Sequence, residues 1–198
     1  MTKENIIGGK FGFPKNFHIG KSFPPFLSGE PALLHNARSG IKLVVDQIKP
    51  KNVWVPSYLC PTILTAIDPK VSRISFYPID SQLKVKSEFN LKDIGQGDLF
   101  IFIDYFGFPF DKSLLHYLHK KQCFLFRDCS QALFYDCSND LCDFILYSPR
   151  KFLGVPDGVI LHFKKNFKIR VDYLSRPDKG IIYKMFCALL LRREYDIY

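Results

Sequence analysis

The sequence predicts an α/β protein in which helices cover both faces of a mostly parallel β-sheet. Short and continuously apolar runs, typical of buried strands, alternate along the chain with segments whose apolar residues recur at helical spacing. The chain has 198 residues, of which 47% are hydrophobic, so it is long enough to bury one substantial core. We therefore expect a three-layer α/β/α domain.

The N-terminal part of the chain contributes an arm and then the first helix. Residues 1–30 are rich in Gly, Phe and Pro and show no sustained period, which predicts an extended arm laid over the body. Residues 37–48 have helical spacing of their apolar side chains, and Ser39 is placed to cap the start of this helix. The ordered domain is expected to cover residues 31–180.

The next three elements are expected to be a strand, a helix and a strand. Residues 52–57 form a short β-rich run that Pro56 stops. Residues 59–67 favour a helix, and residues 71–80 favour a second strand.

The same alternation continues in the second half of the chain. Residues 98–104 predict a buried strand, 111–121 a helix with an apolar leucine face, and 123–128 another strand. Two further strands are expected at 143–148 and 158–163. A final helix is expected over residues 181–198.

Composition argues against several classes of partner. The formal net charge is +9, but Lys and Arg are interleaved with Asp and Glu, so no nucleic-acid-binding arm stands out. The most apolar late segment, 181–191, is too short to span a bilayer and contains Lys184. Six cysteines without a CxxC pair and an N-terminus without a signal peptide predict a reduced, cytoplasmic protein.

Polar residues follow the predicted strands at the points where they end. They lie in residues 56–60, 104–107, 128–131 and 148–151, while residues 36–40 precede the first helix. Ligands of parallel α/β sheets bind beyond the carboxyl ends of the strands. We therefore expect these five segments to converge on one rim.

Three groups on this rim together suggest one cofactor. Lys151 is able to form a Schiff base with an aldehyde if a dry site and the neighbouring Arg150 lower its pKa. Asp128 is suited to hold a protonated ring nitrogen, and a helix start at residues 38–40 offers N–H groups and a hydroxyl to a phosphate. An aldehyde, a pyridinium and a phosphate describe pyridoxal 5′-phosphate (PLP).

Six motifs also resemble, in order and approximate spacing, the DegT/DnrJ/EryC1/StrS family of sugar aminotransferases, which are PLP enzymes of fold type I. The motifs are "IIGGKFGF", "HNARSGIKLVV", "VWVPSYLCPTILTAI", "DYFGFP", "FRDCSQA" and "YSPRKFLGVPDGVI". The resemblance covers about residues 6–163. It implies the fold type I large domain, and it implies a small C-terminal domain that this chain is expected to lack.

The resemblance assigns roles to the rim residues. It implies that Lys151 carries the Schiff base, that Asp128 pairs with the pyridine nitrogen, and that Gln131 lies near the ring and its 3-hydroxyl. Arg38 and Ser39 fall where family members bind the phosphate.

The remaining assignments are also implied by the resemblance. Ser148 matches a phosphate-binding serine, and either Tyr58 or Cys60 lies near the position of the residue that stacks on the ring. Asp104 stands where many relatives carry a histidine, and it is expected near the cofactor.

The resemblance further implies a homodimer that transfers an amino group from an amino acid to a nucleotide-linked keto-sugar in polysaccharide or amino-sugar biosynthesis. Two alternatives are a non-catalytic relative that keeps the fold and acts as a partner subunit, and an unrelated α/β protein that binds an anion at residues 36–40. A metal site at His116 and His119, which have i, i+3 spacing, is disfavoured because no carboxylate or cysteine is placed to complete it.

Overall fold

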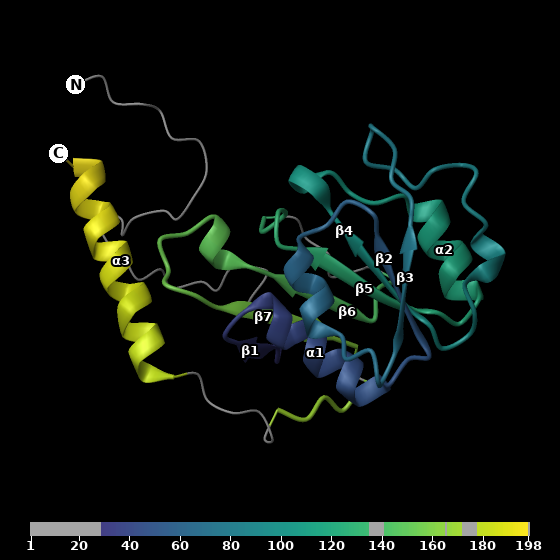
Figure 1. Ribbon diagram of the computed structural model, residues 1–198, viewed down its shortest axis with the longest axis horizontal. Coiled ribbons are helices and arrows are strands. Elements are labelled where there is room, and N and C mark those ends of the chain that lie inside the picture. The colour runs from purple at the N-terminus through teal and green to yellow at the C-terminus, as the bar shows by residue number, and fades with distance from the viewer. Residues whose placement is uncertain (1–28, 135–140, 165, 172–177, 198) are drawn as a thin grey trace.

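Seven strands form one mixed sheet in the computed structural model, which describes residues 29–134, 141–164, 166–171 and 178–197 (Figure 1). The strand order is β1-β7-β6-β5-β4-β2-β3. All pairs from β6 to β3 are parallel, whereas β7 is antiparallel to both β6 and β1. The strands are β1 (Ala32–Leu34), β2 (Asn52–Pro56), β3 (Arg73–Tyr77), β4 (Leu99–Ile103), β5 (Phe124–Cys129), β6 (Phe144–Tyr147) and β7 (Val159–Phe163).

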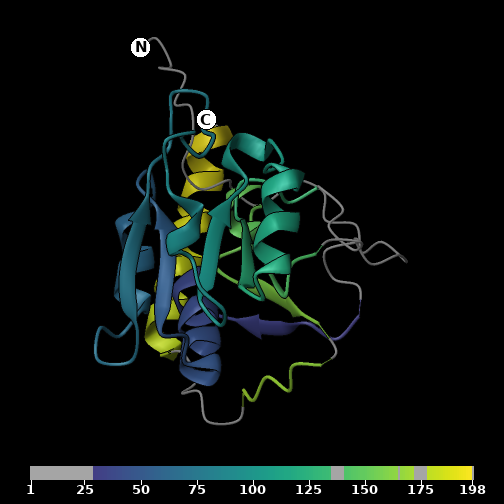
Figure 2. The same cartoon turned by 90° about the vertical axis from the view of Figure 1, so that its right-hand side faces the viewer.

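Helices cover both faces of this sheet, which gives the predicted three layers (Figures 1 and 2). The α-helices are α1 (Ala37–Ile48), α2 (Lys112–Lys120) and α3 (Lys179–Ile197). Four 3₁₀ helices lie between them: η2 (Pro61–Ala66), η3 (Leu91–Asp93), η4 (Tyr105–Gly107) and η5 (Pro149–Lys151). Among the helices of the described residues, none has the length and hydrophobicity that a bilayer-spanning segment requires.

The sheet has a separate apolar core on each face, because successive side chains of a strand point to opposite sides. On β2, Val53 and Val55 pack into the core under α1, and Trp54 packs into the core under α2. Both faces are therefore buried, which explains why the central strands are continuously apolar instead of alternating. Each core also takes residues from β4 and β5.

The start of α1 is held tightly against the sheet. A Cβ atom added to Gly40 would lie 2.7 Å from Leu146 Cδ1, so any larger residue would have to displace this buried side chain of β6. The predicted cap at Ser39 is wrong: Asn36 is the N-cap, and its Oδ1 accepts a hydrogen bond from the Ser39 backbone N–H at 3.1 Å. Asn36 has the extended backbone that an N-cap requires, whereas Ser39 is already helical.

The predicted strands and the helices at 37–48, 111–121 and 181–198 are confirmed, with ends shifted by up to a few residues. The helix expected at 59–67 is a 3₁₀ helix over Pro61–Ala66, a short tighter turn of the kind that often connects other elements. The short strand β1 was not predicted, because three residues carry no readable period. The predicted arm lies outside the described residues except at its end, and the domain boundaries stay predictions.

Candidate active site

The predicted rim exists at the carboxyl edge of the parallel strands. Tyr58 follows β2, Asp104 follows β4, Gln131 follows β5, and Lys151 follows β6 within η5. The backbone N–H of Asp104 donates to the carbonyl oxygen of Asp128 at 3.1 Å, which continues the β4–β5 ladder to this edge. Strand direction therefore brings four distant parts of the chain to one side of the sheet.

Asp128 is a buried carboxylate at the end of β5. Its side chain is 6% exposed, and its Oδ1 accepts a hydrogen bond from the Ser130 backbone N–H at 2.8 Å. Alternation along β5 places Asp128 on the same face as Phe126, which packs in the core under α1. The carboxylate therefore faces the layer that also contains the start of α1.

Cys60 is an exposed thiol at the start of η2, at the same edge of the sheet. The pKa of the Cys60 thiol is lowered mainly by a hydrogen bond with Thr62, where Sγ and Oγ1 lie 3.1 Å apart. The positive charge of Lys151 lowers the same pKa further, and the negative charge of Asp128 raises it. Asp128 lies at the end of β5 and Lys151 follows the paired strand β6, so both segments lie at the same edge of the sheet as Cys60, which follows β2.

Lys151 is solvent-exposed, so the described residues do not form the dry site expected around it. Its neighbour Arg150 lies 3.7 Å from Asp157, Nε to Oδ1, and the carboxylate partly offsets the charge that was expected to act on the lysine. The lysine is nevertheless fixed at its backbone, since its N–H donates to the Ser148 carbonyl oxygen at 3.1 Å.

Asp157 joins the lysine loop to the start of α1. Its Oδ2 lies 2.9 Å from His35 Nδ1, and the backbone N–H of Gly158 donates to the His35 carbonyl oxygen at 3.1 Å. Together with the contact to Arg150, these bonds tie residues 149–158 to the residue before the N-cap. A partner 122 positions away leaves no local signal at Asp157 in the sequence.

The predicted phosphate-binding residues lie at this junction. Ser148 is buried directly after β6, two residues beyond the Leu146 side chain that Gly40 contacts. Ser39 therefore lies close to the end of β6, with the backbone N–H groups of the first turn of α1 around it. Arg38 is exposed on the same turn.

Tyr58 packs against Tyr105, which lies in η4. Their ring centroids are 5.5 Å apart, and the Tyr105 hydroxyl donates to the carbonyl oxygen of Tyr58. Burial is the main cause that raises the pKa of Tyr105, and the charge of Asp128 adds to it. Gln131 Oε1 accepts from the Phe106 backbone N–H at 2.7 Å, so Gln131 holds the 105–107 turn in place.

Asp104 lies on the other face of the sheet, which differs from its expected place beside the ring. Its Oδ2 is 2.8 Å from both Nε and Nη2 of Arg127, the residue before Asp128 on β5. Since neighbouring residues of a strand point to opposite faces, the carboxylate that binds Arg127 faces away from Asp128. Burial raises the pKa of Asp104, and the Arg127 guanidinium opposes that rise.

These residues fit PLP: a lysine amine and a buried carboxylate lie at the carboxyl ends of two adjacent parallel strands, and the helix start at Ser39 and the buried Ser148 lie beside the lysine loop. The described residues contain no group of three or more His, Cys, Asp or Glu side chains placed to hold an ion. His116 and His119 are exposed on α2.

Comparison with solved structures identifies the fold. The chain superimposes on a NifS-like protein with a TM-score of 0.64 at 15% identity, covering 83% of this chain and 53% of the other. The fold is that of fold type I PLP-dependent transferases, as predicted. A Streptococcus pneumoniae protein described as a sugar aminotransferase, solved in apo and PMP forms, gives a TM-score of 0.56 at 17% identity for its apo form, over 80% of this chain and 45% of that one.

A sphingosine-1-phosphate lyase from Burkholderia pseudomallei gives a TM-score of 0.57 at 16% identity, covering 82% of this chain and 48% of its own. The chain thus spans about half the length of these solved structures. No protein-family model and no curated protein matches the sequence.

Proposed function

We propose that this chain binds PLP and belongs to an aminotransferase that acts on a nucleotide-linked keto-sugar, with an amino acid as amino donor. The observation that carries the proposal is that Asp128 lies at the end of β5 while Lys151 follows β6, the parallel strand paired with β5, so both lie at one edge of the sheet. An amine and a carboxylate in one neighbourhood are the two protein groups that PLP chemistry needs. The sugar substrate is supported by the motif resemblance.

PLP, when bound, supplies an electron sink that stabilises a carbanion next to nitrogen. The Asp128 carboxylate would hold a proton on the ring nitrogen through a charge-assisted hydrogen bond. Lys151 Nζ would hold the aldehyde group and would be the amine placed to move a proton at the substrate carbon. Ser39, Ser148 and the N–H groups at the start of α1 would bind the phosphate.

The cofactor site is tested by chemical trapping. The purified protein is incubated with PLP and reduced with borohydride, and the modified lysine is then identified by peptide mass spectrometry. We expect the label on Lys151 and a loss of labelling in Lys151→Ala. The control Lys51→Ala removes an exposed lysine next to the start of β2, at the opposite end of the sheet, and should label like the wild type. Labelling spread evenly over surface lysines contradicts the proposal.

The substrate is tested separately on the PLP-loaded protein. Glutamate and a nucleotide-linked keto-sugar are added, and the amino sugar is detected by mass spectrometry. Sedimentation of the same sample tests the proposed homodimer. If Lys151 is labelled but no amino group is transferred, the proposed cofactor site is supported and the proposed substrate is wrong.

A further inference from the structure

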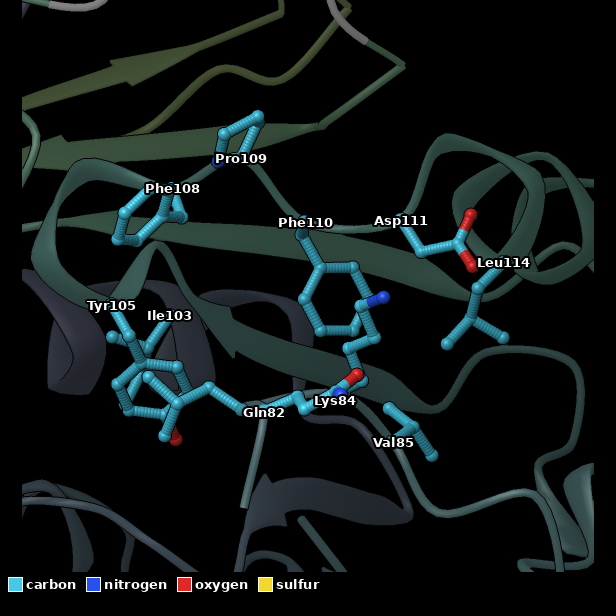
Figure 3. Close-up of a pocket in the computed structure, with 11 residues that line it drawn as sticks. Gln82, Lys84, Val85, Ile103, Tyr105, Phe108, Pro109, Phe110, Asp111 and Leu114 are labelled. Carbon is cyan, nitrogen blue, oxygen red and sulfur yellow. The ribbon is translucent and has the colours of Figure 1, made fainter. Parts of the chain in front are cut away.

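A cavity of about 640 Å³ lies next to the rim, and none of the nine residues assigned above to the cofactor lines it (Figure 3). It is enclosed by two loops, 82–85 after β3 and 105–111 after β4. Cavities of about 300–1,000 Å³ are the usual size of sites for small organic molecules. Its volume therefore suits a ligand as large as an amino acid or a nucleoside.

The first loop is a tight turn organised by Asp80. The Asp80 Oδ1 accepts from the backbone N–H groups of Gln82 and Lys84 at 2.8 and 2.9 Å. These bonds hold Leu83 at φ 63°, a left-handed conformation that a leucine rarely adopts. The strain places an apolar side chain in the wall of the cavity, where glycine or asparagine would be the usual turn residue.

Aromatic rings surround one end of the cavity. Tyr105 and Phe110 are buried, with exposed fractions of 4% and 9%, and Phe108 is 72% exposed at the rim. Figure 3 shows these three rings around a common space, with Ile103 beside Tyr105. Such a surface favours an aromatic or large aliphatic group, because rings pack face to edge and shed ordered water.

Side chains of opposite charge lie at the other end of the cavity. The Lys84 side chain extends past Phe110 toward the end of the cavity where Asp111 and Leu114 lie (Figure 3). The pKa of the Asp111 carboxyl is lowered mainly by its hydrogen bond from Ser113, and the charge of Lys84 also lowers it. The cavity thus offers an ammonium and a carboxylate together, next to an apolar space.

We propose that this cavity binds a zwitterionic α-amino acid with a bulky apolar side chain, at a site separate from the cofactor. Lys84 binds the carboxylate of the ligand, Asp111 attracts its ammonium group, and the side chain of the ligand packs between Tyr105, Phe108 and Phe110. A ligand with one charge alone can pair with only one of Lys84 and Asp111, the second of which also accepts from Ser113 as the N-cap of α2. The site therefore selects zwitterions over simple amines and acids.

The test measures binding to the full chain without PLP, by isothermal calorimetry or saturation-transfer NMR. The probes are L-phenylalanine, 3-phenylpropionate and phenethylamine, which share the ring and differ in charge. We expect saturable binding of L-phenylalanine, and about fivefold weaker binding of each analogue, because an exposed charge pair contributes modestly. Phe108→Ala should weaken binding about tenfold. The control Phe76→Ala removes an exposed ring on β3 outside the cavity and should bind like the wild type.

Three results would overturn the proposal. One is no saturation with L-phenylalanine up to about 10 mM. Another is equal affinity for the zwitterion and both analogues. The third is binding that survives Phe108→Ala but disappears in Lys151→Ala, because the amino acid would then occupy the cofactor site. Labelling of Lys151 by PLP does not depend on any of these results, so the two proposals fail separately.

Discussion

The buried ion pair between Asp104 and Arg127 should be a main determinant of stability at the carboxyl edge. The two side chains are 1% and 3% exposed, and both Nε and Nη2 of Arg127 lie 2.8 Å from Asp104 Oδ2. Asp104 Oδ1 is buried with no hydrogen-bond partner among the described residues. The guanidinium therefore supplies most of the compensation for a carboxylate held away from water.

Arg127→Met removes the Nε and Nη2 donors to Asp104 and puts an apolar side chain of similar length in their place. Breaking one side of a buried pair typically costs about 3–5 kcal/mol, which is a large share of the roughly 5–15 kcal/mol that stabilises a domain. We expect a loss of about 3 kcal/mol in urea unfolding, at the lower end because Asp104 can relieve the loss by taking up a proton. Arg73→Met, at an exposed arginine on β3, should change stability by less than about 0.5 kcal/mol.

The pH dependence separates this mechanism from a simple packing defect. Burial raises the folded pKa of Asp104, and loss of Arg127 raises it further. A carboxyl group whose pKa is raised in the folded state stabilises the fold at pH values at which it is protonated. This stabilisation is lost as the pH rises through the folded pKa. The deficit of Arg127→Met should thus be larger at about pH 7 than at about pH 5. A deficit below about 1 kcal/mol, or one that is equal at both pH values, refutes the reasoning.

Two further predictions concern the site directly. Gly40→Ala should lower the free energy of unfolding by about 1–3 kcal/mol, because its new Cβ meets Leu146 Cδ1 at 2.7 Å. The control is Gly95→Ala, whose new Cβ has its nearest atom at 3.7 Å. Equal losses of the two variants in urea unfolding would contradict the close packing of α1. Cys60 should react with iodoacetamide much faster than Cys123 near neutral pH. Cys60 is exposed and its pKa is lowered, whereas burial raises the pKa of Cys123 to about 12. Peptide mass spectrometry measures both rates, and equal rates would show that the local environment does not govern the thiolate content.

The site residues were predictable to different degrees. Asp128 and Lys151 follow apolar strands, and parallel strands deliver their ends to one edge, so their convergence was readable from order alone. Asp104 also lies at that edge, but the direction of its side chain depends on its ion-pair partner. Arg127 on the adjacent strand offers a buried charge, and this interaction turns Asp104 away from Asp128.

The sequence alone determined the layers and the edge of the sheet at which the parallel strands end, because both follow from local periodicity. Apolar runs of five or six residues bounded by turn signals are typical of strands covered on two faces, and helical spacing between them predicts the covering layers. These patterns lie in consecutive residues, so they are visible in the sequence without knowledge of the tertiary contacts of each segment.

The tertiary structure alone decided which distant side chains meet. His35 with Asp157, Asp104 with Arg127, and the strand β1 on the edge of β7 all depend on contacts between separate segments. The cavity between residues 82–85 and 105–111 likewise exists only after two turns come together. Contact energies of this kind depend on distance and burial in space, and neither quantity has a period along the chain.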